Sequence, residues 1–149
     1  KKAESVGVVL AYEPLNRFET NLINTVAQGI EFCKAQESAS AQLLLDTFHM
    51  HIEEKDTAKA LAIAFQENCV GHFHASENDR GTAGGGQVHW DRVGETLKEN
   101  GYDGMVVLES FSMKVEEIRT AVSCWRPFYD SPEAFMREGL QFVKSLLKV

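Results

Sequence analysis

The sequence predicts an α/β fold in which four parallel strands are each followed by a helix, and three observations support this. Four short apolar runs are bounded by polar or turn residues, which is typical of strands buried on both faces of a parallel sheet. Helical patterns lie between these runs, so strands and helices alternate along the chain. Each run also leads to a carboxylate or an imidazole, and the spacing of about 30 residues suits strand–helix–strand units.

The four predicted strands are short. Each has four to seven residues of nearly continuous apolarity, a length that favours a strand over a helix. The runs are Val6–Tyr12, Gln42–Leu45, Cys69–Phe73 and Met105–Leu108.

The segments between the strands have helical spacing. In Thr20–Glu37 apolar residues recur every three to four positions along one face. These residues are Leu22, Ile23, Val26, Ile30 and Cys33. We expect Asp56 to cap a second helix over Thr57–Glu67. We also expect glycine-rich Gly81–Gln87 to be flexible and Lys114–Val122 to form a weaker helical turn.

Two further helices have recognisable ends. Asp91 is expected to cap a helix over Arg92–Asn100, and Gly101 to end it. Ser131 followed by proline is a typical start for the last helix. Its expected apolar face is Phe135, Leu140, Val143 and Leu147.

Composition bounds the kind of protein. With 149 residues, 44% hydrophobic and 25% charged, we expect residues 1–149 to form a single domain around one core. A net charge of −7 disfavours nucleic acid as a partner, because that affinity comes mainly from Lys and Arg on phosphate. We find no apolar stretch long enough for a membrane span and no signal peptide.

The three cysteines do not suggest a disulfide framework or a zinc site. Cys33, Cys69 and Cys124 are widely spaced and odd in number, without a Cys-x-x-Cys pair. We therefore expect reduced, buried thiols in a cytoplasmic protein.

One polar residue stands at the end of each predicted strand. These residues are Glu13, Asp46, His74 and Glu109, separated by 33, 28 and 35 residues. The carboxyl ends of parallel strands meet at one edge of a sheet or barrel, and ligands bind at that edge. We therefore expect the four side chains to converge.

A divalent metal ion would relieve the repulsion between three converging carboxylates. Oxygen-rich ligation with one nitrogen suits Mn²⁺ or Mg²⁺, and Co²⁺ or Zn²⁺ is compatible. Taken singly, each residue has a structural explanation: strand-end carboxylates for Glu13 and Glu109, a cap for Asp46 and a satisfied core imidazole for His74. Four residues in one register favour the metal site.

Four segments resemble the ketose 3-epimerases, the D-tagatose/D-psicose 3-epimerase group of the xylose isomerase-like TIM barrels. They are Glu13–Glu19, Leu45–Met50, Gly71–Arg80 and Val107–Phe111. The resemblance runs over essentially the whole chain. It implies the C-terminal half of a (β/α)8 barrel, because that family has eight such units and four are present here.

The resemblance also implies roles for individual residues. Glu13, Asp46, His74 and Glu109 match the metal ligands, with Mn²⁺ as the expected ion, and Glu13 and Glu109 also match the catalytic acid and base. Three further residues match positions that hydrogen-bond the sugar near its carbonyl: Glu19, His49 and Arg80.

The implied reaction is epimerisation of a ketohexose at C3. A base removes the proton next to the carbonyl, a cis-enediolate forms with its charge stabilised by the metal ion, and an acid returns the proton to the other face. Without four of the eight strands, we expect the inner face to be covered by self-association or by a missing N-terminal half.

Other functions remain open on sequence alone. The same four ligands would serve an aldose–ketose isomerase, a hydroxypyruvate isomerase or an inosose dehydratase. An apurinic-site nuclease would need more histidines and a basic groove, which five histidines and the acidic charge disfavour. A half-barrel that binds metal or sugar without catalysis is the non-enzymatic alternative.

Overall fold

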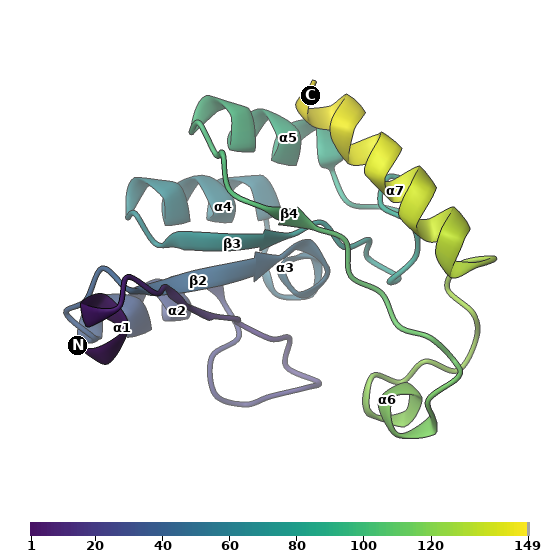
Figure 1. Cartoon of the computed structure of the whole chain (residues 1–149), viewed down its shortest axis with the longest axis horizontal. Coiled ribbons are helices and arrows are strands. Elements are labelled where there is room, and N and C mark those ends of the chain that lie inside the picture. Colours follow the sequence, from purple (N-terminus) through teal and green to yellow (C-terminus); the bar gives the residue numbers. More distant parts are fainter. Residues whose placement is uncertain (149) are drawn as a thin grey trace.

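The computed structural model describes residues 1–148 and has a sheet of four parallel strands at its centre (Figure 1). The strands are β1 (Leu10–Tyr12), β2 (Ala41–Asp46), β3 (Val70–His74) and β4 (Val106–Val107). They lie in the order β1-β2-β3-β4, and each pairs in parallel with the next. The predicted parallel sheet is confirmed.

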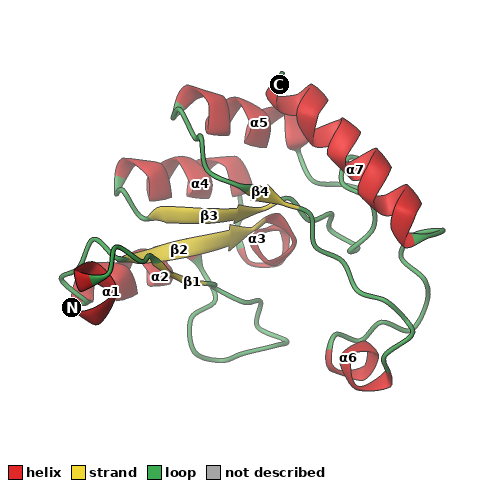
Figure 2. Cartoon of the chain, viewed as in Figure 1, coloured by secondary structure: helices red, strands yellow, loops and turns green. Residues whose placement is uncertain are grey.

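Most of the helices form a layer on one side of the sheet (Figure 2). The helices are α1 (Lys2–Ser5), α2 (Val26–Ala35), α3 (Thr47–Glu53), α4 (Thr57–Gln66), α5 (Trp90–Glu99), α6 (Glu116–Ala121) and α7 (Pro132–Leu147). Within the layer α2 contacts α4, α4 contacts α5, and α5 contacts α7. Among the described residues, none of these helices combines the length and apolarity that crossing a bilayer requires.

The core lies between the sheet and this helix layer. Along β2 the side chains alternate, so that Leu43 and Leu45 are fully buried and Leu44 is only partly buried on the opposite face. Phe73 of β3 and Leu61 of α4 join the same cluster. The three cysteines are buried free thiols, as expected.

Several local predictions are confirmed. The Asp56 carboxylate accepts a hydrogen bond from the N–H of Lys59 at the start of α4, and Ser131 caps α7 through the N–H of Ala134. Gly101 follows α5 with φ +63°, a left-handed conformation that favours glycine.

Three predicted boundaries are wrong, because strand pairing and capping, and not the apolar pattern alone, decide where these elements begin. The first strand begins at Leu10, since pairing with β2 starts there. The first long helix begins at Val26, because Thr25 and Gln28 form a capping box, and Leu22 consequently lies in a loop with 70% of its surface exposed. Asp91 lies inside the first turn of α5 and does not cap it.

Two other differences concern helices. The short helix α3 follows β2 directly, since the Asp46 side chain caps it by accepting the N–H of Phe48, and the sequence pattern did not predict it. Leu140, predicted to face the core from the last helix, is 51% exposed, whereas Phe135 and Val143 are buried.

The alternation along β2 predicts the effect of one core deletion. Leu43→Ala should lower the free energy of unfolding by about 2–5 kcal/mol, because it leaves a cavity under α2. Leu22→Ala should change it by less than about 0.5 kcal/mol, because that side chain is exposed. Urea titration of both variants followed by circular dichroism measures the difference, and equal losses would contradict this arrangement.

Candidate metal centre

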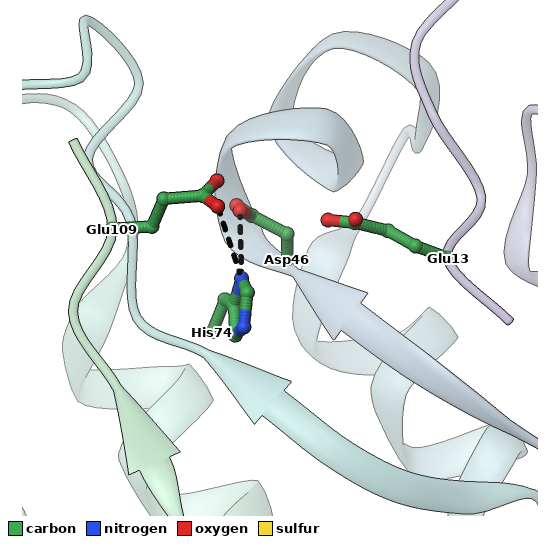
Figure 3. A group of neighbouring side chains, drawn as sticks. All are labelled: Glu13, Asp46, His74 and Glu109. Atoms are coloured by element: carbon green, nitrogen blue, oxygen red, sulfur yellow. Dashed lines mark ion pairs between the residues drawn. The ribbon is translucent and has the colours of Figure 1, made fainter. Parts of the chain in front are cut away.

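The four strand-end side chains converge at the carboxyl edge of the sheet (Figure 3). Glu13 follows β1, Asp46 and His74 end β2 and β3, and Glu109 lies two residues beyond β4. One donor atom from each lies within 4.8 Å of the donor atoms of the other three. The predicted convergence is therefore present in the structure.

Strand register and local bonds set this arrangement. Asp46 and His74 are direct partners in the β2–β3 ladder, so they reach the edge side by side. Beyond them, the Thr47 hydroxyl accepts the N–H of Ser76 at 2.9 Å, and the Ser76 hydroxyl donates to the Asp46 carboxylate at 3.0 Å. The two loops after the strands are thus tied to each other.

The donor set fits a divalent cation. Within residues 1–148, two buried side-chain atoms lack a hydrogen-bond partner, Glu13 Oε1 and His74 Nδ1, and both belong to this group. Buried polar atoms are normally satisfied, so these two are available to a ligand. Bonds of about 2.1 Å to an octahedral ion would place donors about 3 to 4.2 Å apart, close to the observed spacing.

Crowding changes the proton affinity of the two outer carboxyls. Burial, together with the charges of Asp46 and Glu109, raises the pKa of Glu13 to about 7. Burial and the charge of Asp46 also raise the pKa of Glu109, although Arg80 opposes this. Both groups therefore hold a proton more tightly than ordinary glutamates do.

The pKa values of the two central residues, Asp46 and His74, are shifted so that each residue favours its charged form. Burial disfavours the charge of Asp46, but His74 and the Arg80 guanidinium outweigh it and lower the pKa of Asp46. Burial likewise disfavours protonated His74, but Asp46 at 3.5 Å and Glu109 at 3.9 Å outweigh it and raise the pKa of His74.

Arg80 lies beside the centre. Its Nη1 donates to Asp46 Oδ2 at 3.0 Å and to Glu109 Oε2 at 2.9 Å. Its guanidinium lies 3.8 Å from the centre of the Phe48 ring. A fixed positive charge thus stands against two of the crowded carboxylates.

His49 is a neutral ring with an N–H donor beside each nitrogen. The backbone N–H of Asn16 donates to His49 Nδ1 at 3.1 Å, and the Arg80 guanidinium lies beside Nε2. Burial lowers the pKa of His49 and keeps the ring neutral. Nε2 lies 3.8 Å from Glu13 Oε1 and 3.2 Å from Arg80 Nη2.

Of the three predicted sugar contacts, two adjoin the centre and the third is linked to it indirectly. His49 and Arg80 lie beside the four donors. Glu19 reaches them through Asn16, whose amide donates to Glu19 Oε1 at 2.8 Å. Glu19 also lines a groove of about 350 Å³ together with Phe18 and residues 121–123.

Sequence reasoning did not identify some of the residues that hold the centre together. Asn16 is 2% exposed and bonds both His49 and Glu19, yet in the sequence it is one polar residue after a proline turn. Glu77 is fully buried and was not singled out within its motif. Burial is their distinguishing signal, and it depends on tertiary packing.

A family model described as xylose isomerase-like TIM barrel matches residues 1–146. The chain belongs to this family. Over 134 residues it is 42% identical to a protein named "Probable ketose 3-epimerase" from a Synechocystis strain, covering 90% of this chain and 46% of that protein.

Solved structures show the same similarity. A structure of L-ribulose 3-epimerase superposes with a TM-score of 0.92 at 34% identity, over 98% of this chain and 49% of that one. A D-psicose 3-epimerase with D-tagatose, from Clostridium cellulolyticum H10, gives a TM-score of 0.87 at 35% identity, over 97% and 51%. The chain spans about half the length of these relatives, which confirms the predicted half of a (β/α)8 barrel.

The raised pKa of Glu13 predicts a pH dependence in the metal-free chain. Between 4.5 and about 7 the folded chain keeps a proton that the unfolded chain releases, so stability falls as the pH rises through this window. Glu13→Gln removes this group, so the Tm of the variant minus that of the parent should be larger at about pH 8 than at about pH 5.

Thermal melts of both proteins in EDTA measure this difference. A Tm difference that stays constant over the whole pH range would contradict the raised pKa of Glu13.

Proposed function

We propose that this chain carries the metal-binding and acid–base residues of a ketose 3-epimerase, an isomerase that inverts C3 of a ketohexose. The observation that carries the proposal is the convergence of Glu13, Asp46, His74 and Glu109 at the carboxyl edge of the sheet. The similarity to proteins named ketose, D-psicose and L-ribulose 3-epimerase supports a ketose substrate, and D-psicose is the ketohexose among these names.

The four donors would hold one divalent ion, and Mn²⁺ is our proposal because three oxygens and one nitrogen suit it; Mg²⁺, Co²⁺ and Zn²⁺ are the alternatives. Such an ion, when bound, polarises the substrate carbonyl and stabilises the charge of the enediolate.

Glu13 and Glu109 would move the proton. They come from the two outer strands, with Asp46 and His74 between them, so they can address opposite faces of a substrate carbon. One carboxylate takes the C3 proton, and the carboxylic acid on the other side returns a proton to the opposite face. In the metal-free chain burial raises the pKa of both groups, that of Glu13 to about 7.

The neighbouring residues would orient the sugar. His49 presents Nε2 toward the centre, 3.8 Å from Glu13 Oε1, where it can hydrogen-bond a substrate oxygen. Arg80 lies against Asp46 and Glu109 at the centre, and Glu19 lines the neighbouring groove with Phe18 and Phe48. Fixing the substrate in this way accounts for a large share of catalysis in such reactions.

We further propose that a complete sugar site needs a covered β1 edge. Among the described residues β1 pairs with β2 alone, and a groove of about 380 Å³ lies where β1, β2 and α2 meet. The adjacent apolar residues Val8, Val9 and Leu10 are 48–62% exposed. A second copy of the chain or the other half of the barrel would bury them.

Metal binding is tested by thermal melting. Because an ion that binds only the folded chain stabilises it by mass action, Mn²⁺ at 100 times its Kd should add about 2.7 kcal/mol. Glu109→Gln should abolish the resulting rise in Tm, whereas Glu31→Gln, at an exposed position on α2, should keep it. An equal rise in both variants would place the ion elsewhere.

The reaction is tested by solvent exchange. In D₂O the Mn²⁺-loaded protein should convert D-fructose or D-tagatose to the C3 epimer and place deuterium at C3, since the proton leaves and returns. Glu13→Gln should lower the rate by about 10²-fold or more. Hydroxypyruvate and inosose, the substrates of the alternative enzymes, are assayed separately.

Sedimentation of the same samples assigns the activity to a species. We expect activity to follow an associated form or a complex with the other barrel half. Conversion of hydroxypyruvate or inosose alone would overturn the epimerase proposal.

A further inference from the structure

Glu77 is a buried carboxylate without a role in the mechanism above. It is fully buried, and none of the ion pairs among residues 1–148 includes it. A buried charge is costly unless hydrogen bonds replace its water shell. In the sequence it stands three residues after His74 and three before Arg80.

Four N–H groups replace that water shell. Glu77 Oε1 accepts from the backbone N–H groups of Asn78 at 3.1 Å and Val88 at 3.0 Å. Oε2 accepts from the backbone N–H of Gly84 at 2.9 Å and from the indole N–H of Trp90 at 2.8 Å. Although burial opposes it, these bonds lower the pKa of Glu77 and keep it ionised.

The glycine-rich segment is wrapped around this carboxylate. A Cβ on Gly86 would lie 2.6 Å from Glu77 Cγ, so only glycine allows the backbone this close. Gly84 has φ +90°, and a Cβ there would lie 2.5 Å from the Phe142 ring. The segment expected to be flexible is therefore anchored at specific atoms.

Glu77 and Arg80 are the two ends of one turn. The N–H of Arg80 donates to the Glu77 carbonyl at 3.0 Å, and Arg80 has φ +64°, a left-handed conformation that a residue with a side chain adopts only when its surroundings fix it. From this turn the guanidinium reaches Asp46 and Glu109.

We infer that Glu77 is a positioning residue for Arg80. Its carboxylate draws the N–H groups of the glycine-rich segment together, and that anchored segment holds the Glu77–Arg80 turn, so that the guanidinium stands at the edge of the metal centre. The part of the inference that concerns sugar binding rests on the proposed function, whereas the part that concerns the geometry of Arg80 does not.

Glu77→Gln tests this inference with little change of shape. The substitution replaces one carboxylate oxygen by an NH₂ group that faces two N–H donors. The hydrogen bonds to that oxygen are lost, and N–H donors then point at one another. Glu54→Gln is the matched control: Glu54 is a partly buried carboxylate that accepts the N–H of Val26 at 2.7 Å and contacts none of the centre's residues.

The first readout needs no ligand. Side-chain NMR signals of the Arg80 guanidinium, assigned by their loss in Arg80→Lys, should be sharp and slowly exchanging in the parent and in Glu54→Gln. In Glu77→Gln they should broaden toward those of exposed Arg137, and the Gly84 and Val88 amides should exchange at least about tenfold faster. Unchanged Arg80 signals would overturn the inference.

The second readout concerns the sugar. In Mn²⁺-loaded protein, Glu77→Gln should weaken D-fructose binding about tenfold. It should leave Mn²⁺ affinity within about twofold, since the four donors lie at strand ends. With Arg80→Ala already present, Glu77→Gln should add no further loss, and additive losses would overturn the inference.

Two outcomes separate the inference from the proposed function and from simple misfolding. If the parent in its associated form, or in complex with the other barrel half, binds no ketose while its Arg80 signals still depend on Glu77, the proposed function fails and the positioning role stands. If Glu77→Gln does not fold, Trp90→Phe removes one of the four donors, and a smaller broadening of the Arg80 signals is then expected. Signals identical to the parent's in Trp90→Phe would overturn the positioning role.

Discussion

Three carboxylates and an imidazole share a few ångströms at one edge of the sheet, and the surrounding structure is arranged to tolerate that charge. Asp46 stays ionised because Ser76, Arg80 and the N–H of Phe48 surround it with donors. Glu13 has no such donor at Oε1, and burial with the charges of Asp46 and Glu109 raises its pKa to about 7. The crowding thus creates two classes of carboxyl, one fixed as an anion and one able to exchange a proton.

This crowding follows from parallel register, which is why the sequence could predict it. A parallel ladder brings the ends of successive strands to one edge, so a polar residue at the end of each apolar run must meet its counterparts. Asp46 and His74, which are direct ladder partners, show this clearly. Caps such as Asp56 and Ser131 were predictable for a similar reason, since their hydrogen bonds reach only three residues along the chain.

Features that depend on distant partners could not be predicted in this way. Helical spacing in Thr20–Glu37 suggested one long helix, but the helix starts at Val26, whose N–H donates to the Glu54 carboxylate 28 residues away, and Leu22 is left exposed. Asn16 gains its importance from His49, which is 33 residues away in the sequence. Glu77 likewise depends on Val88 and Trp90. Neither has a signal in sequence spacing, because what distinguishes each is burial against a segment that folding brings to it.

The strands do not support the four donors equally, and this bears on the proposed chemistry. Asp46 and His74 end the two inner strands, each with a neighbour on both sides. Glu13 follows a three-residue strand that is paired with β2 alone. The two proposed ligands on the inner strands therefore lie on the best-supported part of the sheet, whereas the position of one proposed proton carrier depends on what covers the β1 edge. Under the proposed function, the β2–β3 ladder would place Asp46 and His74 for the ion, but Glu13 must be fixed by that cover before it can act on a sugar.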